Sequence, residues 1–305
     1  MSAELITQAI ISNAATIRNR ETFFNAIEEF YENDKALMRL QPAFFKHILN
    51  ESRFNIILMT CCFIFSNSIK SIKDIKNYCE INSISSQNSI IAVIALLKAS
   101  GRIDTERDSD DRRNVKLVIT QKGLKDLKSY IYTVIAPLKT LHPEYDFNME
   151  AIAFKSFLQD FFYGVSVPLL KGVTYKKINT KIDYYIDKDG GRSLLLYLYM
   201  KSVVNSMQVN STINQLSFEI SVSRTQVLRL VNSMEKDGYI HNIGKNNIIV
   251  NQSLIELVED YMSIYFSYIE YYLFCSADLR RILINENTNP ETNTVYDIPY
   301  HLRKA

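Results

Sequence analysis

The chain of 305 residues is 47% hydrophobic and 22% charged. Such a composition is typical of a globular protein and excludes a disordered or fibrous one, and the length is sufficient for two domains that each bury a core. The formal net charge is only +2. Any surface that binds nucleic acid must therefore be local, because the molecule as a whole is not a polycation.

The cysteines and the apolar stretches indicate in which cellular compartment the protein is expected. The cysteines form no C-x-x-C motif and have no histidine cluster beside them: Cys61, Cys62, Cys79 and Cys275. This pattern favours a reducing cytoplasm over a disulfide framework or a zinc site. The N-terminus lacks the pattern of a secretory signal, and the longest apolar stretch, residues 54–65, is too short to span a bilayer. We therefore expect a cytoplasmic protein with no metal site and no membrane partner.

Motifs of the common enzyme classes are missing from the sequence. It contains no G-x-x-x-x-G-K-[ST] or G-x-G-x-x-G loop for phosphate, no G-x-S-x-G elbow for a nucleophile and no H-E-x-x-H zinc motif. The histidines are scattered along the chain: His47, His142, His241 and His301. We therefore expect neither an enzyme nor a cofactor.

The N-terminal part of the chain reads as helical. Residues 4–50 repeat apolar side chains at spacings of three and four, which predicts amphipathic helices, and residues 53–65 predict a strongly apolar helix. Cys61 and Cys62 lie inside that apolar stretch and are expected to be buried and unreactive. Cys79, near a lysine at a helix end, is the better candidate for an oxidant sensor.

Two helices joined by a turn are expected next. A helix over residues 71–79, a turn near residues 80–85 and a helix from Ser85 or Ser86 to Ala99 follow in that order. The first turn of the second helix is polar, whereas its later residues supply an apolar face. The N-terminal residues of this helix are therefore expected to be exposed.

A helix stop and a charged hairpin come after these helices. Gly101 is the expected stop, and residues 103–107 can form a strand. After a charged turn, Val115, Leu117 and Ile119 alternate with their neighbours as a return strand.

The second half of the chain repeats this order. Residues 212–218 and residues 223–234 predict two helices joined by a short turn. Residues 235–240 then align with residues 98–103 at an offset of 137, including the glycine and the aliphatic residue that begins the strand. The following hairpin, residues 241–248, lacks the acidic and basic tip of the first. An internal repeat of this kind decides the architecture.

Two long helices complete the prediction. Residues 121–138 are expected to form one until Pro137 and Pro143 end it. Residues 252–274 predict another, which is apolar enough to pack against the N-terminal helices, against the first half or across a dimer. We expect three segments: residues 1–140, residues 141–285 and a polar tail of residues 286–305.

The charged hairpin resembles a known signature. It is similar to the wing of the MarR family of bacterial transcription regulators at Leu97, Gly101, Ile103, Arg107, Asp108, Asp111, Arg112, Arg113, Leu117, Thr120, Lys122 and Gly123. The resemblance implies that Arg112 or Arg113 reaches the minor groove of DNA and that Asp108 and Asp111 brace the tip. With the repeat, it implies two MarR-like copies fused in tandem. The alternative is a solvated, salt-bridged hairpin that contacts nothing.

The N-terminal residues of each second helix are the other candidates for DNA contact. Gln87 and Asn88 are candidate base readers, because Gln and Asn can bond adenine bidentately, and Arg224 and Arg229 can contact phosphate or a guanine edge. A capped helix start and a solvated helix face are the respective alternatives. The expected DNA-binding residues are Ser86, Gln87, Asn88, Arg107, Arg112, Arg113, Ser223, Arg224, Thr225, Gln226, Arg229 and Lys245.

These patterns lead to one expected fold and function. The fold is mainly α with small β-hairpin wings, as tandem winged helix-turn-helix modules on a helical scaffold. The function is that of a sequence-specific transcriptional regulator that binds double-stranded DNA as a single-chain pseudo-dimer. A plasmid-type replication initiator and a protein-interaction scaffold that does not bind DNA are the alternatives. The resemblance also implies a small-molecule effector between scaffold and DNA-binding lobes, and a homodimer of the chain stays open.

Overall fold

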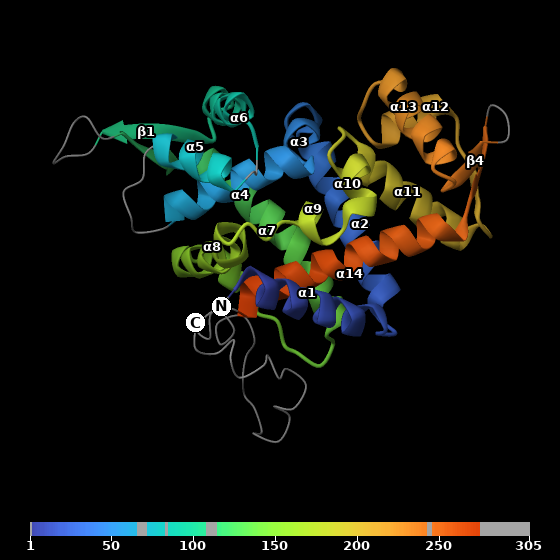
Figure 1. Ribbon diagram of the computed structural model, residues 1–305, viewed down its shortest axis with the longest axis horizontal. Coiled ribbons are helices and arrows are strands. Elements are labelled where there is room, and N and C mark those ends of the chain that lie inside the picture. Colours follow the sequence, from blue (N-terminus) through green and yellow to red (C-terminus); the bar gives the residue numbers. More distant parts are fainter. Residues whose placement is uncertain (1, 66–71, 83–84, 108–114, 243–245, 275–305) are drawn as a thin grey trace.

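The structure, a computed structural model, describes residues 2–65, 72–82, 85–107, 115–242 and 246–274. Within these residues the chain is mainly helical, with one two-stranded and one three-stranded antiparallel sheet. The expected fold class, mainly α with small hairpins, is confirmed at this level. Figure 1 shows the sheets at opposite ends of the long axis of the molecule.

The first half of the chain follows the predicted order of elements. Its elements are α1 (Ala3–Arg18), α2 (Phe23–Leu40), α3 (Pro42–Ile48), α4 (Glu51–Phe65), α5 (Ile72–Ile81), α6 (Gln87–Ala99), β1 (Ile103–Arg107), β2 (Val115–Ile119) and α7 (Gln121–Leu141). The strands pair antiparallel, with Ile103 opposite Ile119 and Arg107 opposite Val115. The predicted strand bounds of this hairpin are therefore confirmed.

Helix α7 differs from the prediction at its end. We expected it to end at Leu138, where Pro137 and Pro143 would stop it, but the helix continues to Leu141, with His142 as its C-cap. Proline inside a helix removes one backbone hydrogen bond. Ile135, Leu138 and Leu141 are fully buried, so packing of this last turn offsets the loss.

The second half contains the same kinds of element with additional short helices. Its elements are η1 (Met149–Ala153), α8 (Lys155–Leu170), α9 (Tyr175–Ile178), α10 (Thr180–Ile186), α11 (Gly191–Val204), β3 (Gln208–Asn210), α12 (Ile213–Glu219), α13 (Arg224–Lys236), β4 (Ile240–Asn242), β5 (Asn247–Val250) and α14 (Gln252–Phe274). Strand β5 is central, between β3 and β4. The sequence did not predict β3, which adds a third strand to this hairpin.

Helices α1 and α14 lie side by side along one side of the molecule (Figure 1). The buried stripe of α1 consists of Ile6, Ile10, Ala14 and Ile17, at the spacing of one helical face. At the end of α1, Arg18 forms ion pairs with two consecutive carboxylates of α14. Of the alternatives left open for the last helix, packing against the N-terminal helices is the main one that the structure shows.

The two halves are packed together through matching helices. Helix α2 packs on α7 and α8 packs on α14, while across the halves α4 packs on α8 and α2 packs on α11. The buried apolar residues of both halves form one continuous core. Helices α2 and α4 of the first half therefore each contact a helix of the second half.

Apolar helices also raise the question of membrane spans. No single helix among the described residues is long and apolar enough to cross a membrane. The pair α3 and α4, bent by 94° between them, passes that test together on length and composition alone.

Candidate nucleic-acid interface

Helix α6 exposes its predicted polar first turn. Ser86 caps the helix, because its hydroxyl accepts a hydrogen bond from the backbone N–H of Ser89 at 3.3 Å. Gln87 and Asn88 are both exposed. The Gln87 amide donates to a carboxylate oxygen of Glu80, at 2.6 Å, so this candidate base reader is held by the preceding helix.

Helix α13 has the same construction at the other end of the molecule. The Ser223 hydroxyl caps it by accepting from the backbone N–H of Gln226 at 3.2 Å. Arg224, Thr225 and Arg229 are exposed. The side chain of Gln226 is half-buried, and its amide donates to the backbone carbonyl of Asp189 at 3.4 Å. Gln226 therefore fixes the helix to the scaffold, whereas the two arginines point to solvent.

Helices α6 and α13 have the same bounds at an offset of 137 residues. Helices α6 and α13 each have 13 residues, each follows a serine cap, and each ends at a glycine with positive φ. These glycines are Gly101, with φ +70°, and Gly238, with φ +77°. Ile91 and Leu228, which occupy the same position in the two helices, are both exposed, at 46% and 44%.

The exposed faces of the two helices differ in charge. On α13 the exposed face carries Arg224, Arg229 and Lys236, with Glu235 as its only acid. On α6 it carries Ile91, Ala92, Ala95 and one cation, Lys98. The exposed face of α13 therefore carries more positive charge than that of α6.

The hairpin tips hold the remaining predicted contacts. Arg107, the last residue of β1, is exposed. Asp108, Asp111, Arg112 and Arg113 of the first tip lie outside the described residues, as does Lys245 of the second. The strands that carry each tip are in place, and their roles in DNA contact stay predictions.

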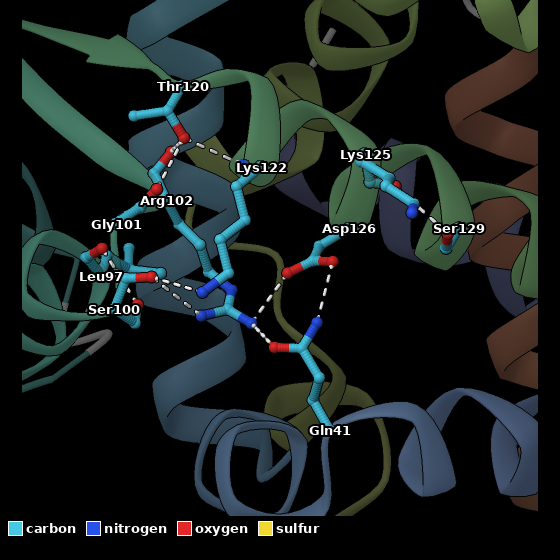
Figure 2. A network of polar contacts seen from close by, with 11 residues as sticks. Gln41, Leu97, Ser100, Gly101, Arg102, Thr120, Lys122, Lys125, Asp126 and Ser129 are labelled. Atoms are coloured by element: carbon cyan, nitrogen blue, oxygen red, sulfur yellow. Dashed lines mark hydrogen bonds and ion pairs between the residues drawn. The ribbon is translucent and has the colours of Figure 1, made fainter.

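A network of hydrogen bonds joins the first hairpin to the scaffold (Figure 2). Thr120 caps α7 and also donates from its hydroxyl to the carbonyl of Gly101 at 2.7 Å. Its backbone N–H donates to the carbonyl of Arg102 at 3.0 Å. Lys122 donates to the carbonyl of Ser100 at 2.8 Å. These hydrogen bonds therefore connect the end of α6, the hairpin and the start of α7, and we call this connection the joint.

Arg102 extends this joint to the helical scaffold. Its guanidinium donates to the side-chain oxygen of Gln41 at 2.5 Å and lies 2.7 Å from a carboxylate oxygen of Asp126 on α7. It also stacks on the ring of Phe44, 3.2 Å from the ring centroid. Arg102 is only 4% exposed, so a buried charge is held by partners from α3, from α7 and from Gln41 between α2 and α3.

The second half repeats the joint with different side chains. Tyr239 occupies the place of Arg102, and its carbonyl accepts from the backbone N–H of Asn251 at 2.9 Å. The Asn251 amide donates to the carbonyl of Gly238 at 2.7 Å, as Thr120 does to Gly101. The backbone geometry is thus repeated without the buried charge.

A cavity of about 70 Å³ lies beneath the first hairpin. It is lined mostly by apolar side chains of α3, α4, α6, β2 and α7. Arg102 also lines it, and the Nε atom of Arg102 has no hydrogen-bond partner within the described part of the chain. A ligand that entered here would contact the scaffold and the hairpin at once.

The described cysteines are not placed for redox chemistry. Cys61 and Cys62 are buried as expected, and burial raises the pKa of Cys61 to about 12. Cys79, the predicted sensor candidate, is fully buried, and burial raises its pKa to about 11. Since the thiolate is the reactive form, the structure disfavours Cys79 as a sensor.

Comparison with known proteins adds no further assignment. No protein-family model matches the chain, and no curated protein matches it. In the described ranges, no group of three or more His, Cys, Asp or Glu side chains is placed to hold a metal ion. The functional conclusion therefore rests on the chain's own residues and geometry.

Proposed function

We propose that the protein is a sequence-specific regulator that binds double-stranded DNA through two winged helix-turn-helix modules in one chain. One observation carries the proposal: α6 and α13 are serine-capped helices of equal length, each followed by a hairpin. They lie at opposite ends of the scaffold, on the side away from α1 (Figure 1). A dimeric regulator places its two recognition helices in successive major grooves, which requires both helices on one side of the molecule.

The two ends read DNA by different chemistry in this proposal. At one half-site, Arg224 and Arg229 contact phosphates or guanine edges, and at the other, Gln87 and Asn88 contact bases. In this proposal Ile91 and Leu228, which are both exposed, contact thymine methyl groups. Because the residues differ, the operator is asymmetric in sequence.

The cavity beneath the first hairpin is the proposed place for a small-molecule effector. It is bounded by both scaffold and hairpin, so a ligand there changes the position of one relative to the other. The buried Arg102 at its wall ties these parts together through Asp126 and Gln41. Effector binding would thereby alter the spacing of the two recognition helices.

The first experiment compares binding of the protein to its own upstream DNA and to a random duplex of equal length over a range of salt concentrations. Tight, selective binding with a steep salt dependence is expected, because released counterions supply much of the affinity. Light scattering of the free chain and of the complex gives the stoichiometry, expected to be one chain per operator. Protection of tandem direct repeats at an origin would instead favour a replication initiator.

A charge-matched pair of variants tests the assignment of α13. The double change Arg224→Ala and Arg229→Ala is expected to lower affinity and to reduce the magnitude of the salt slope by about 2. The control, Lys139→Ala with Lys155→Ala, removes two exposed cations from scaffold helices and is expected to leave the slope unchanged. Equal slopes for both double variants would overturn the assignment.

One observation favours a second candidate, a module that binds protein. The exposed face of α6 is apolar at Ile91, Ala92 and Ala95, and an exposed apolar face is typical of interaction sites. Failure to bind either duplex at low salt, with α13 folded, would favour this reading.

A further inference from the structure

A second cavity lies between the two halves of the chain. Its volume is about 40 Å³, and it is lined by α4 and α7 of the first half and by α8, α9 and α14 of the second. Phe54, Leu58 and Tyr130 also line the cavity beneath the hairpin and so separate the two spaces. The space is sufficient for more than one water molecule, and its position is distinct from the proposed effector cavity.

Glu51 is the only charged residue among those that line this cavity. It belongs to the first turn of α4, and one carboxylate oxygen accepts a hydrogen bond from the Asn55 amide at 3.0 Å. Burial raises the pKa of Glu51 despite this bond. Glu51 is half-buried, so its carboxylate is only partly solvated.

The nearby cations are already paired with other carboxylates. Arg192 lies 2.6 Å from Asp34. Lys176 lies 3.2 Å from Asp187 and 3.4 Å from Asp183. Within the described residues no salt bridge reaches Glu51, so this region carries more carboxylates than cations, and a further cation would be stabilised beside Glu51.

Tyrosine side chains form much of the remaining wall. The ring of Tyr268 lies 6.4 Å from that of Tyr175 and 5.9 Å from that of Tyr272, between centroids. Tyr268 is 5% exposed, and its hydroxyl has no hydrogen-bond partner among the described residues. A buried hydroxyl without a partner is rare, so a polar group that reached this hydroxyl would satisfy it. Aromatic faces around a carboxylate suit an organic cation.

We propose that this cavity binds a small primary ammonium compound. The ammonium group pairs with the Glu51 carboxylate and donates a hydrogen bond to the Tyr268 hydroxyl, while the short alkyl part packs against the tyrosine rings and Leu169. Because Glu51 comes from the first half and Tyr268 from the second, the ligand stabilises the packing of the halves. This site is independent of DNA binding and goes beyond the function proposed above.

Isothermal titration calorimetry of the full chain with ethylammonium chloride tests the proposal, with ethanol as the neutral isostere and sodium chloride for ionic strength. For a ligand of three heavy atoms, a dissociation constant on the order of 1 mM is expected. Ethanol at the same concentration is expected to give no saturable binding. Equal binding of ethanol, or no binding of ethylammonium up to about 50-fold above that constant, would overturn the proposal.

Variants locate the site. Glu51→Gln keeps the size of the side chain and is expected to weaken ethylammonium binding at least tenfold, whereas Glu256→Gln, an exposed change on α14, leaves it unchanged. Tyr268→Phe is expected to weaken binding by a smaller factor, while circular dichroism confirms that each variant is folded. Wild-type affinity in a folded Glu51→Gln variant would refute the assignment.

Discussion

Two glycines at the joints between hairpin and scaffold differ in what surrounds them. A Cβ atom on Gly123 would lie 2.0 Å from the carbonyl oxygen of Arg102, a backbone atom that cannot move aside cheaply. A Cβ atom on Gly238 would meet no atom within 4 Å, although φ there is +77°. Close approach constrains the first glycine, and backbone conformation constrains the second.

Gly123→Ala is therefore expected to lower the free energy of unfolding by about 3 kcal/mol, as overpacking does in rigid surroundings. Gly238→Ala is the matched control and is expected to cost about 1–2 kcal/mol, the strain of a left-handed conformation. Urea unfolding followed by circular dichroism measures both. A larger loss for Gly238→Ala than for Gly123→Ala would contradict the close approach at the first joint.

For single residues, local backbone features could be predicted from the sequence, whereas tertiary partners could not. The serine caps and glycine stops were predictable, because capping and positive φ depend on local backbone geometry. The partners of Gln87 and Gln226 were not, since Glu80 and Asp189 approach them only through tertiary folding. The buried charge of Arg102 was also missed, and its position beside the glycine stop gave no sign of Asp126.

At the scale of elements, Glu270 joins three helices. Its carboxylate contacts His142 at the end of α7 and accepts a hydrogen bond from the Asn13 amide of α1 at 2.8 Å. Glu270 and His142 are 2% and 1% exposed. The pair therefore fixes the C-terminal turn of α7 between α1 and α14.

Glu270→Ala is expected to lower the free energy of unfolding by about 3–5 kcal/mol, because it leaves buried polar partners without their acceptor. Glu256→Ala, on an exposed position of the same helix, is expected to change stability by no more than about 0.5 kcal/mol. Thermal and urea unfolding of both variants provide the test. Similar stabilities would show that the contact does not hold the helices together.

The elements themselves were predictable where pattern and turn chemistry agree. The bounds of α14 and of both strands of the first hairpin follow from alternation and spacing. Helix α7 runs past Pro137 because burial of its last turn outweighs the local penalty. Strand β3 was missed because its three residues include only one buried apolar side chain, Val209, too little for a periodic signal.

For the whole molecule, buried tyrosines connect stability to pH. Burial raises the pKa of a set of tyrosines well above the ordinary value: Tyr31, Tyr130, Tyr175, Tyr185, Tyr199, Tyr261, Tyr265, Tyr268 and Tyr272. In the unfolded chain the pKa of a tyrosine is about 10 and that of a cysteine is about 8.5. Above those values the unfolded state binds fewer protons than the folded state.

The free energy of unfolding is therefore expected to fall as pH rises, first above about pH 8.5 through the cysteines and more steeply near pH 10. Each group contributes a slope of about 1.4 kcal/mol per pH unit between its unfolded and folded pKa values. Urea midpoints measured from pH 8 to pH 11 provide the test. Tyr261→Phe removes one such group and is expected to make the slope shallower; a flat profile would contradict the burial of these hydroxyls.

All contacts between the two halves are made within one covalent chain. Two identical subunits dissociate on dilution and can exchange with variant subunits. Because both are encoded by one gene, a mutation changes the same residue in both subunits. The halves described here are joined by the chain, so each stays at a fixed local concentration for the other. A substitution in α13 changes one end only, so natural variation can reshape each end separately while one core maintains both.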